Sequence, residues 1–500
     1  MKRSLKCVTA ALLVLFGFAL LAASVHAQST FVYTNNNDIP NTVTGFSVGL
    51  GGTLTMVPGS PFLTGGEGVG FYFASNTATV TIRKKLLYVS NNGTNNISGF
   101  SINTTTGALT PVLGSPFATG GSGIFGISLA VTPNGKFVYA GNAGSGDISA
   151  FSVGSNGALT PIVGSPFFVG DAPDGIKVSP NGKFLGVALP FSDSVAMFHI
   201  GSNGALASVP GSPFPQGGTA GGDQTAYVDM SCKSNLLFAA ISNSTETEVG
   251  VSTIASSGAL SPIAASPFTF VPGVNSNVGI LSPKNQWLFV SNQDSNTITS
   301  LDVGANGSLA QVSGSPFLDS GALTPSGMAT NAEGTLLYVA NGDNTVTGFS
   351  IDNSNGSLSP VPGSPFLTGG AGILSSLTTF PAKRVEGEGN ENGDDGHKGH
   401  FRFEAERECE ASSGMDFEES DSGKGMKGSV NAYTAVGNTA TITGVGTLLD
   451  GTPVHYTAIV LGNAPVIGAN RFAISWVTST GSVFHTSGAL TDGYIVVHAQ

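Results

Sequence analysis

Residues 124–167 read IFGISLAVTPNGKFVYAGNAGSGDISAFSVGSNGALTPIVGSPF, and this stretch decides the fold. It contains four short apolar segments separated by turns rich in Gly, Asn and Ser. Short segments of this kind, bounded by turn residues, are typical of β-strands, because Gly and Asn adopt the backbone angles that tight turns require. The stretch therefore predicts a unit of four strands.

The same unit recurs along the chain. A period of about 40 to 50 residues with four strands is typical of a propeller blade. Seven copies predict an all-β, seven-bladed β-propeller with four strands in each blade. We interpret the recurring proline as structural, at an outer edge strand or the turn beside it, with the Phe after it wedged between neighbouring blades. The tetrapeptide GSPF or ASPF has its prolines at Pro61, Pro116, Pro166, Pro213, Pro267, Pro316 and Pro365.

The two ends of the repeat region predict how the ring closes. Residues 28–62 begin at a second strand and contain three strands of a blade. Residues 367–382 supply a single first strand after the seventh GSPF. We therefore expect this late strand to lie innermost in the first blade, with the three N-terminal strands outside it, a closure that removes the open sheet edge.

The composition agrees with an all-β repeat. The chain has 500 residues, of which 71 are Gly, and only 10% are charged, against about 25% in an average protein. These values exclude a coiled coil, a nucleic-acid binder and an acid-rich disordered chain. The chain can still form a hydrophobic core, because 40% of the residues are hydrophobic and 31 are Phe.

Residues 1–27 have the pattern of a secretory signal peptide: basic residues, an apolar run over 8–23, and small residues before Ala27. We expect cleavage after Ala27 and an exported, monomeric product in the periplasm, in the medium or at the cell surface. No other apolar stretch predicts a membrane span.

The expected mature chain is acidic. Three of 19 basic residues leave with the leader, so 16 basic and 31 acidic residues give a net charge of 16 − 31 = −15. Such a charge disfavours nucleic acid and anionic membranes as partners.

Two cysteines, Cys232 and Cys409, remain once Cys7 has left with the leader. A disulfide between them could form in an oxidising compartment. We expect both instead to be free and buried, because a buried thiol behaves as a small hydrophobic group.

The strands LYVSN (87–91), LFVSN (288–292) and LYVAN (337–341), together with the GALTP and GSPF segments, resemble the lactonase-like seven-bladed propellers. This group contains bacterial 6-phosphogluconolactonase and overlaps the YVTN-repeat proteins, and the resemblance covers residues 28–382. It implies lactone hydrolysis by His, Arg and acidic residues at the mouth of the central channel, commonly with a His just before the first strand of a blade. The matching positions hold neither His nor Arg: they are Asn76, Ile127, Asp174, Ala226, Asn277 and Ser326.

The best remaining candidates for chemistry lie in blades four and five. Lactone hydrolysis needs a base or a metal to activate water and a group that stabilises the oxyanion. The carboxylates of Asp171, Asp174, Asp223 and Asp229 could also hold a hard divalent cation such as Ca²⁺. No other cofactor is evident. We favour the interpretation that they are ordinary turn residues. The candidates are Asp171, Asp174 and Lys177 in VGDAPDGIKV, and Asp223 and Asp229 in GGDQTAYVD.

Two other polar features of the propeller are interpreted as structural. His199 lies within the strand VAMFHI, so we expect it to be remote from the channel. The run Arg83, Lys84 and Lys85 precedes an apolar strand and predicts a solvated turn.

After Pro381 the composition changes, and residues 383–400 predict an acidic, Gly-rich linker. His397 and His400 beside Asp394 and Asp395 could bind a metal there, but a solvated linker fits better. Alternating segments from about residue 401 to 500 predict roughly seven strands of a small β-sandwich or barrel. This region loosely resembles the post-COAP type of β domain. Trp476 and Tyr433 could form a ligand face in it, although core packing fits better.

The sequence supports three functions. We expect an exported binding module for an unidentified sugar, lactone or protein ligand at the channel mouth, because the propeller repeat is regular while the expected catalytic cluster is missing. The first alternative is a lactone hydrolase that uses the Asp-rich loops of blades four and five. The second is a structural repeat protein of the cell surface.

Overall fold

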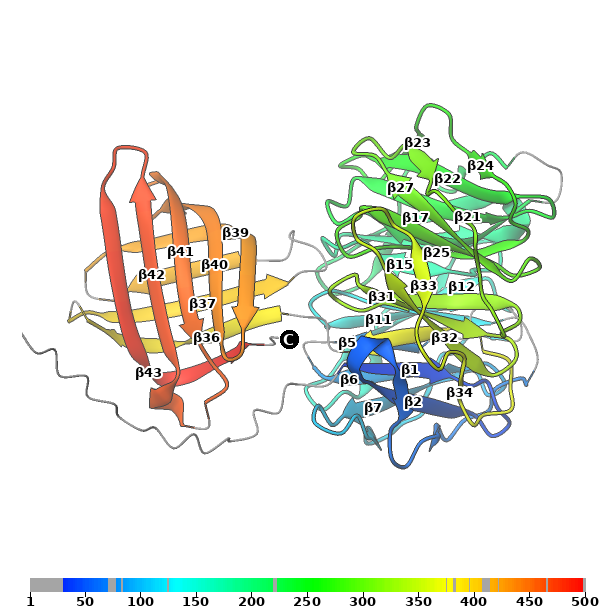
Figure 1. Ribbon diagram of the computed structural model, residues 1–500, viewed down its shortest axis with the longest axis horizontal. Coiled ribbons are helices and arrows are strands. Elements are labelled where there is room, and N and C mark those ends of the chain that lie inside the picture. The colour runs from blue at the N-terminus through cyan, green and yellow to red at the C-terminus, as the bar shows by residue number, and fades with distance from the viewer. Residues whose placement is uncertain are drawn as a thin grey trace, which may run out of the picture.

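A computed structural model describes residues 30–70, 78–81, 84–123, 126–218, 223–374, 376–380, 384–394, 396–406, 414–420, 422–464 and 466–497. The expected signal peptide, Arg83, Asn76, Asp395 and Cys409 lie outside the described residues. Figure 1 shows two bodies, a ring of blades and a barrel. None of the described helices is long and apolar enough to cross a membrane.

The ring consists of seven antiparallel sheets, which confirms the predicted seven-bladed propeller. Each blade has four strands, and the outermost strand is split into two short segments that both pair with the third strand. From the inside outward, the first four blades are β35 (Leu377–Phe380), β1 (Phe31–Asn35), β2 (Thr42–Val48), β3 (Leu54–Met56) and β4 (Phe62–Leu63); β5 (Ala78–Thr81), β6 (Leu86–Asn91), β7 (Asn96–Ile102), β8 (Leu109–Pro111) and β9 (Phe117–Ala118); β10 (Ile127–Val131), β11 (Phe137–Asn142), β12 (Asp147–Val153), β13 (Leu159–Pro161) and β14 (Phe167–Phe168); β15 (Ile176–Val178), β16 (Phe184–Leu189), β17 (Ser194–Ile200), β18 (Leu206–Ser208) and β19 (Phe214–Pro215).

The last three blades follow the same order, and two short 3-10 helices, η1 (Leu50–Gly52) and η2 (Pro190–Ser192), interrupt the loops of the ring. The strands are β20 (Gln224–Met230), β21 (Leu236–Ser242), β22 (Thr247–Ile254), β23 (Leu260–Pro262) and β24 (Phe268–Phe270); β25 (Ser276–Leu281), β26 (Trp287–Asn292), β27 (Thr297–Val303), β28 (Leu309–Gln311) and β29 (Phe317–Leu318); β30 (Pro325–Thr330), β31 (Leu336–Asn341), β32 (Thr345–Ile351), β33 (Leu358–Pro360) and β34 (Phe366–Leu367).

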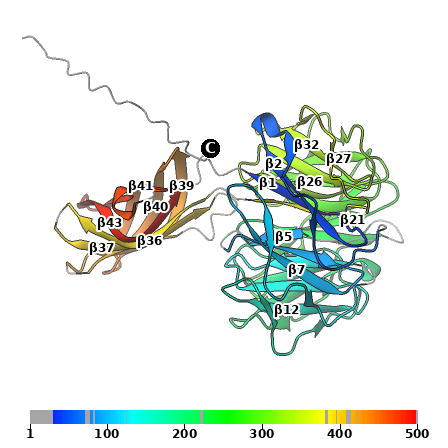
Figure 2. The same cartoon turned by 90° about the horizontal axis from the view of Figure 1, so that it is seen from below.

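The ring closes as predicted. β35 lies innermost in the first blade and pairs with β1, with Phe380 opposite Phe31. Figure 2 shows β1 and β2 in the same part of the ring as β32 of the seventh blade. Because strands from both ends of the repeat region share one sheet, the first blade has no open edge where the ring is joined.

The second strand of each blade is buried on both faces because it is packed between two neighbouring blades. In four blades its tyrosine reaches the next blade: the hydroxyl of Tyr33 donates to the Gly107 carbonyl (2.8 Å), and Tyr88 and Tyr139 repeat the contact. The Tyr338 hydroxyl donates to the Gly52 carbonyl (2.8 Å) and so joins the seventh blade to the first. Gly52 has φ 87°, and a Cβ there would lie 2.6 Å from Leu336. This tyrosine contact therefore fastens one blade to the next.

The GSPF element is structural, as predicted. Each proline follows a cis peptide bond in the turn between the two outer segments. The Phe after it is partly buried and packs on the apolar cluster shared with an adjacent blade, as Phe62 and Phe117 do.

The C-terminal region is a closed barrel, one of the two predicted forms. Its core contains Trp476 and Tyr433, with the Trp476 ring stacked on Phe484 at 4.0 Å, so both side chains pack in the core. A short helix, η4 (Ile467–Ala469), precedes the seventh strand. The eight strands in barrel order are β36 (Arg384–Gly393), β37 (Lys398–Glu406), β38 (Gly414–Glu419), β39 (Gly425–Val436), β40 (Thr439–Leu448), β41 (Pro453–Leu461), β42 (Arg471–Thr478) and β43 (Val483–Val497).

The expected linker over residues 383–400 is wrong, because residues 384–393 form β36 and β37 begins at Lys398. A high Gly content favours a flexible linker when the sequence is read alone. Gly387 instead faces the barrel interior, where a Cβ would lie 2.7 Å from the Phe403 ring. Gly387 and Gly399 make room for the rings of Phe403 and Phe417 on neighbouring strands.

The expectation of a free thiol at Cys232 is also wrong, because Cys232 is disulfide-bonded. It lies in the turn between β20 and β21. The described residues contain no second cysteine, so its partner lies outside them.

Candidate functional site

The two ends of the propeller channel are built from different connections. The first strand of every blade runs from one end to the other and the second strand returns, so the turns between these two strands lie at one end. The loops between second and third strands, and the connections between blades, lie at the opposite end. The pairing of Asp147 with Phe168 places the outer segment β14 at this second end as well.

The five candidate residues do not form one group. Asp171 lies in the connection before β15, where it accepts hydrogen bonds from the Ser192 hydroxyl (2.7 Å) and the Ala172 N–H. Asp174 lies in the same connection, and its backbone N–H donates to the Ala188 carbonyl. Asp223 lies in the connection before β20. These three carboxylates therefore lie at the end of the channel formed by the blade connections.

Lys177 and Asp229 lie away from them, on the inner strands themselves. The Lys177 ammonium is 3.0 Å from Asp229 Oδ1, and the exposed fractions of the two side chains are 40% and 7%. Asp229 also accepts hydrogen bonds from the backbone N–H groups of Met230 and Leu281. Asp223 immediately precedes β20 and Asp229 lies near the end of that strand, so about six extended residues, roughly 20 Å, separate them. The ion pair between Lys177 and Asp229, together with the Leu281 hydrogen bond, joins the inner strands of blades four, five and six.

A larger pattern covers the blade-connection end of the ring, which we call the acidic face. Charged residues in its loops and at the adjoining strand ends are all acidic, and the described loops there contain no Lys, Arg or His. The acidic residues are Asp38, Glu67, Asp147, Asp171, Asp174, Asp193, Asp223, Glu246, Asp294, Asp319 and Asp343.

The opposite end, which we call the lysine face, carries six lysines, together with the carboxylates of Glu333 and Asp352 in the turns of blade seven. Six lysines lie in the turns between first and second strands of blades two to six, and five of the six are exposed. The turns touch one another around the channel, since the Cys232 N–H donates to Asn285 Oδ1 of the next blade. These lysines are Lys84, Lys85, Lys136, Lys183, Lys233 and Lys284.

Several carboxylates of the acidic face hold neighbouring loops in place. Asp38 accepts the N–H groups of Ala371 and Gly372, both at 2.7 Å, from the connection between blades seven and one. Asp193 accepts the Gly218 N–H and the Thr225 hydroxyl. These donors are neutral, so the hydrogen bonds order the loops while the net negative charge remains.

Asp319 is the buried member of this group. Burial raises the pKa of its carboxyl to about 6, with the Thr347 hydroxyl and the Asp343 carboxylate as its polar neighbours. The equivalent position after SPF is a threonine in three blades, namely Thr64, Thr119 and Thr368. Asp319 therefore places a titratable group where the repeat elsewhere has a hydroxyl.

His199 lies on the third strand β17, where its ring packs on Phe184 at 5.0 Å, remote from the channel as expected. Lys84 forms part of a turn, as predicted, and its ammonium donates to the Val153 carbonyl (2.8 Å) of the next blade. Within the described ranges, no three His, Cys, Asp or Glu side chains are placed to hold a metal ion together.

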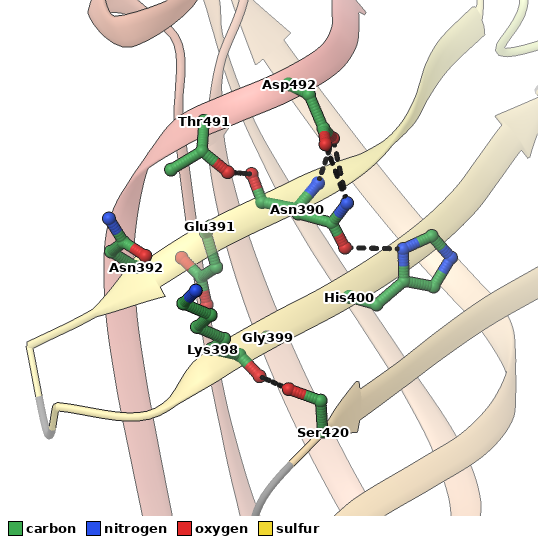
Figure 3. A pocket seen from close by; sticks show the side chains of 9 residues that line it. All are labelled: Asn390, Glu391, Asn392, Lys398, Gly399, His400, Ser420, Thr491 and Asp492. Atoms are coloured by element: carbon green, nitrogen blue, oxygen red, sulfur yellow. Dashed lines mark hydrogen bonds between the residues drawn. The ribbon is translucent and has the colours of Figure 1, made fainter.

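The barrel carries a pocket of about 470 Å³ between β36, β37 and β43 (Figure 3). Asn390 is its central group: its amide donates to Asp492 (2.8 Å to Oδ2), and its Oδ1 lies 3.0 Å from His400 Nδ1. These hydrogen bonds lower the pKa of Asp492. All three side chains are exposed on the outer face of the barrel, so this polar chain orders neighbouring strands in contact with solvent.

The polarity of the two faces does not follow from the composition of the repeat, but the turns of the blades contain a signal for it. The turns TPNGK, SPNGK and SPKN place lysines just before the second strand, whereas GSGD, PFSD and QDSN place aspartates after it. The order of strands in a blade sends these two kinds of turn to opposite ends.

A family model described as "Lactonase, 7-bladed beta-propeller" matches residues 126–218 and 275–371, which contain blades three, four, six and seven. Among solved structures, the chain is similar to a putative 6-phosphogluconolactonase from Bacteroides uniformis, with 17% identity and a TM-score of 0.57 over 71% of this chain and 99% of that one. It is also similar to the periplasmic gluconolactonase of Pseudomonas aeruginosa, with 15% identity and a TM-score of 0.57 over 71% and 99% of the two chains. The comparison with curated proteins gave no match.

At these identities the solved structures establish a shared fold. The seven blades of four strands are the architecture that the family description names. The chain thus carries a lactonase-like seven-bladed β-propeller, matched to that family over four of its seven blades.

Proposed function

We propose that this propeller is a binding module whose acidic face takes a positively charged segment of a partner protein. The observation that carries the proposal is the one-sided charge: eleven carboxylates lie in the described loops and adjoining strand ends of that face, and these loops hold no basic side chain. A face of one sign steers and retains partners of the opposite sign.

Exposed apolar side chains on the same face support a protein as the partner. Protein-binding surfaces combine apolar contact area with a charged rim. Phe168 and Phe191 are 79% and 74% exposed, and both lie beside the connection that carries Asp171. The other large exposed apolar residues of this face are Ile39, Leu63, Val271, Leu318, Leu323 and Leu367.

Lactone hydrolysis is the second candidate, and the match to the lactonase family favours it. Two features of the site weigh against a phosphorylated sugar lactone. The acidic face repels a phosphate group, and Lys177, a cation on an inner strand, is paired with Asp229. Asp171, Asp174 and Asp223 remain the candidate carboxylates for this activity, with or without a divalent cation.

Binding is tested with a fluorescent Lys-rich peptide and a Glu-rich peptide of the same length, titrated with the full chain at several salt concentrations. We expect the basic peptide to bind, and its affinity to fall as salt rises. The variant Glu67→Gln with Asp294→Asn removes two exposed charges of the acidic face and is expected to weaken binding several-fold. The matched control Asp302→Asn with Glu418→Gln removes two exposed charges elsewhere and is expected to leave binding unchanged.

Hydrolysis is tested with a panel of sugar and aliphatic lactones, with and without Ca²⁺. Turnover that is lost in Asp174→Ala would establish the second candidate and overturn the binding-module proposal. No turnover, together with salt-dependent binding of the basic peptide, is the expected result.

A further inference from the structure

The boundary between blades six and seven buries a carboxylate that receives no hydrogen bond. Asp319 follows β29 at the acidic face, and its exposed fraction is 1%. Among the described residues, which run unbroken here from 223 to 374, no donor is placed to hydrogen-bond either of its oxygens. A buried carboxylate without donors is costly, so its charge requires a partner that the described chain does not supply.

The repeat shows what this position normally does. The Asp319 N–H donates to the Asn296 carbonyl (2.9 Å) as the Thr64 N–H of blade one donates to the Asn41 carbonyl (3.0 Å), so the two residues are equivalent. The Thr64 hydroxyl also donates to that carbonyl (3.1 Å) and accepts the Gly66 N–H (3.2 Å). A charged Asp319 has no proton to donate. The packing of the repeat therefore does not account for a carboxylate at this position.

Side chains of blade seven bring further oxygens to the same boundary. The Thr347 hydroxyl and the Asp343 carboxylate are the polar neighbours that act on the pKa of Asp319. The Asn341 amide donates to the hydroxyls of Thr347 (2.9 Å) and Thr345 (3.2 Å), and the Thr345 hydroxyl donates to Asp343 Oδ1 (2.6 Å). These hydrogen bonds hold Asn341 and Asp343 in one cluster with Thr347, beside Asp319.

The Asn341 side-chain oxygen is also buried without a donor among the described residues. Its equivalents accept hydrogen bonds from the preceding blade: Asn91 Oδ1 from an amide of blade one (2.8 Å) and Asn292 Oδ1 from a hydroxyl of blade five (2.7 Å). For Asn341 the preceding blade is the one that carries Asp319. Two other boundaries leave this oxygen without a donor but have a threonine in place of the aspartate, at Asn36 and Asn142.

The boundary thus combines two carboxylates with an amide oxygen, and the described loops of the acidic face contain no basic side chain to balance them. Hard oxygen ligands of this kind are those that Ca²⁺ takes in proteins, and two carboxylates match its charge. Asp343 is only partly buried, so the cluster can be reached from the acidic face.

We infer that the boundary between blades six and seven binds one Ca²⁺ ion. The Asp319 carboxylate and the Asn341 amide oxygen are its buried ligands, and the Asp343 carboxylate is its ligand toward the acidic face. Water completes the coordination, because Ca²⁺ takes about six to eight oxygens. The ion joins blade six to blade seven and is separate from the carboxylates of blades four and five.

Binding is tested by isothermal titration calorimetry of the full chain, treated with a chelator and titrated with CaCl₂ at pH 7.5. We expect a site that Asp319→Asn and Asp319→Thr each weaken more than tenfold. Asp319→Thr restores the residue of other blades and is expected to fold. The matched control Asp294→Asn removes an exposed carboxylate elsewhere on the acidic face and should keep the site. No binding of millimolar Ca²⁺, or unchanged affinity in both Asp319 variants, would overturn the proposal.

The link between the blades is tested by thermal unfolding in a Trp476→Phe background, in which Trp287 reports on the propeller. We expect Ca²⁺ to raise the unfolding temperature, since a ligand of the folded state stabilises it. Mg²⁺ at the same concentration should raise it less, because Mg²⁺ requires a near-ideal octahedron and gives up its water reluctantly. Equal effects of the two ions, or a full Ca²⁺ effect in Asp319→Thr, would show general screening of the acidic face and overturn the site.

Discussion

The Lys177 ammonium lies 3.0 Å from Asp229 Oδ1, across the boundary between blades four and five, and Asp229 Oδ2 accepts the Leu281 N–H of blade six at 2.9 Å. One carboxylate therefore holds the inner strands of three successive blades. Because its oxygens are occupied by an ammonium and two backbone N–H groups, Asp229 orders the channel wall rather than activating water.

Replacing Asp229 should therefore destabilise the propeller much more than replacing Lys177. Asp229→Ala leaves two buried N–H groups and an ammonium without their acceptor, and should cost about 2–4 kcal/mol. Lys177→Met removes a partly exposed partner and should cost less than about 1 kcal/mol. The measurement is guanidinium unfolding in a Trp476→Phe background, in which the buried Trp287 reports on the propeller. Equal losses in the two variants would contradict this account of Asp229.

Asp319 should make the propeller less stable as the pH rises. Its folded pKa of about 6 lies above the ordinary value of 3.8, so the folded state holds the proton more tightly than the unfolded state. The stability contributed by protonated Asp319 is complete below about pH 4 and is lost as the pH rises through 6. The total change is about 3 kcal/mol.

The variant Asp319→Thr, which restores the residue found in three other blades, should remove this pH dependence. It should also stabilise the propeller at pH 7.5. Urea unfolding between pH 4 and 8 measures both effects, and Asp302→Asn, at an exposed carboxylate, is the control. An unchanged pH profile in Asp319→Thr would show that other groups cause the dependence.

Tyr338→Phe should destabilise the ring at the point where it closes. The change removes the hydroxyl that donates to Gly52 and leaves that carbonyl buried without its donor, at a cost of about 1–3 kcal/mol. Tyr88→Phe removes the same contact between blades two and three and should cost about the same. Thermal unfolding compares them; no loss in either variant would show that the hydroxyl contacts do not hold the blades together.

The barrel should depend on a glycine that resembles a linker residue. Gly387→Ala places a methyl group 2.7 Å from the Phe403 ring, whereas Gly414→Ala has its nearest neighbour at 3.7 Å. We expect Gly387→Ala to destabilise the barrel by about 1–3 kcal/mol and Gly414→Ala to have little effect. Trp476 fluorescence in a Trp287→Phe background follows this unfolding. Two variants of equal stability would contradict the assignment of Gly387 to a packed interior.

The propeller could be predicted from the sequence because the same pattern of strands and turns recurs in every blade. Seven copies of one strand and turn pattern set the number of blades, and the unequal ends set the closure through β35 and β1. The barrel was predicted only in part, because the segment around Gly387 has few apolar residues. Gly387 is required there by Phe403 on the neighbouring strand, which becomes its neighbour only after folding.

The candidate site could be predicted less well than the fold. Asp223 and Asp229 are close in sequence, but an extended strand carries them to opposite ends of the channel. The turns of the blades determine the polarity of the two faces. It can be predicted only from the order of the strands, because that order places Lys136 and Asp147 at opposite ends of the blade.

The most direct test of the central claim is the comparison of basic and acidic peptides binding to the full chain at low and physiological salt. The account predicts that the Lys-rich peptide binds, that salt weakens it, and that Glu67→Gln with Asp294→Asn reduces the affinity several-fold. Equal binding of both peptides, no binding of either, or full affinity in that double variant would contradict it.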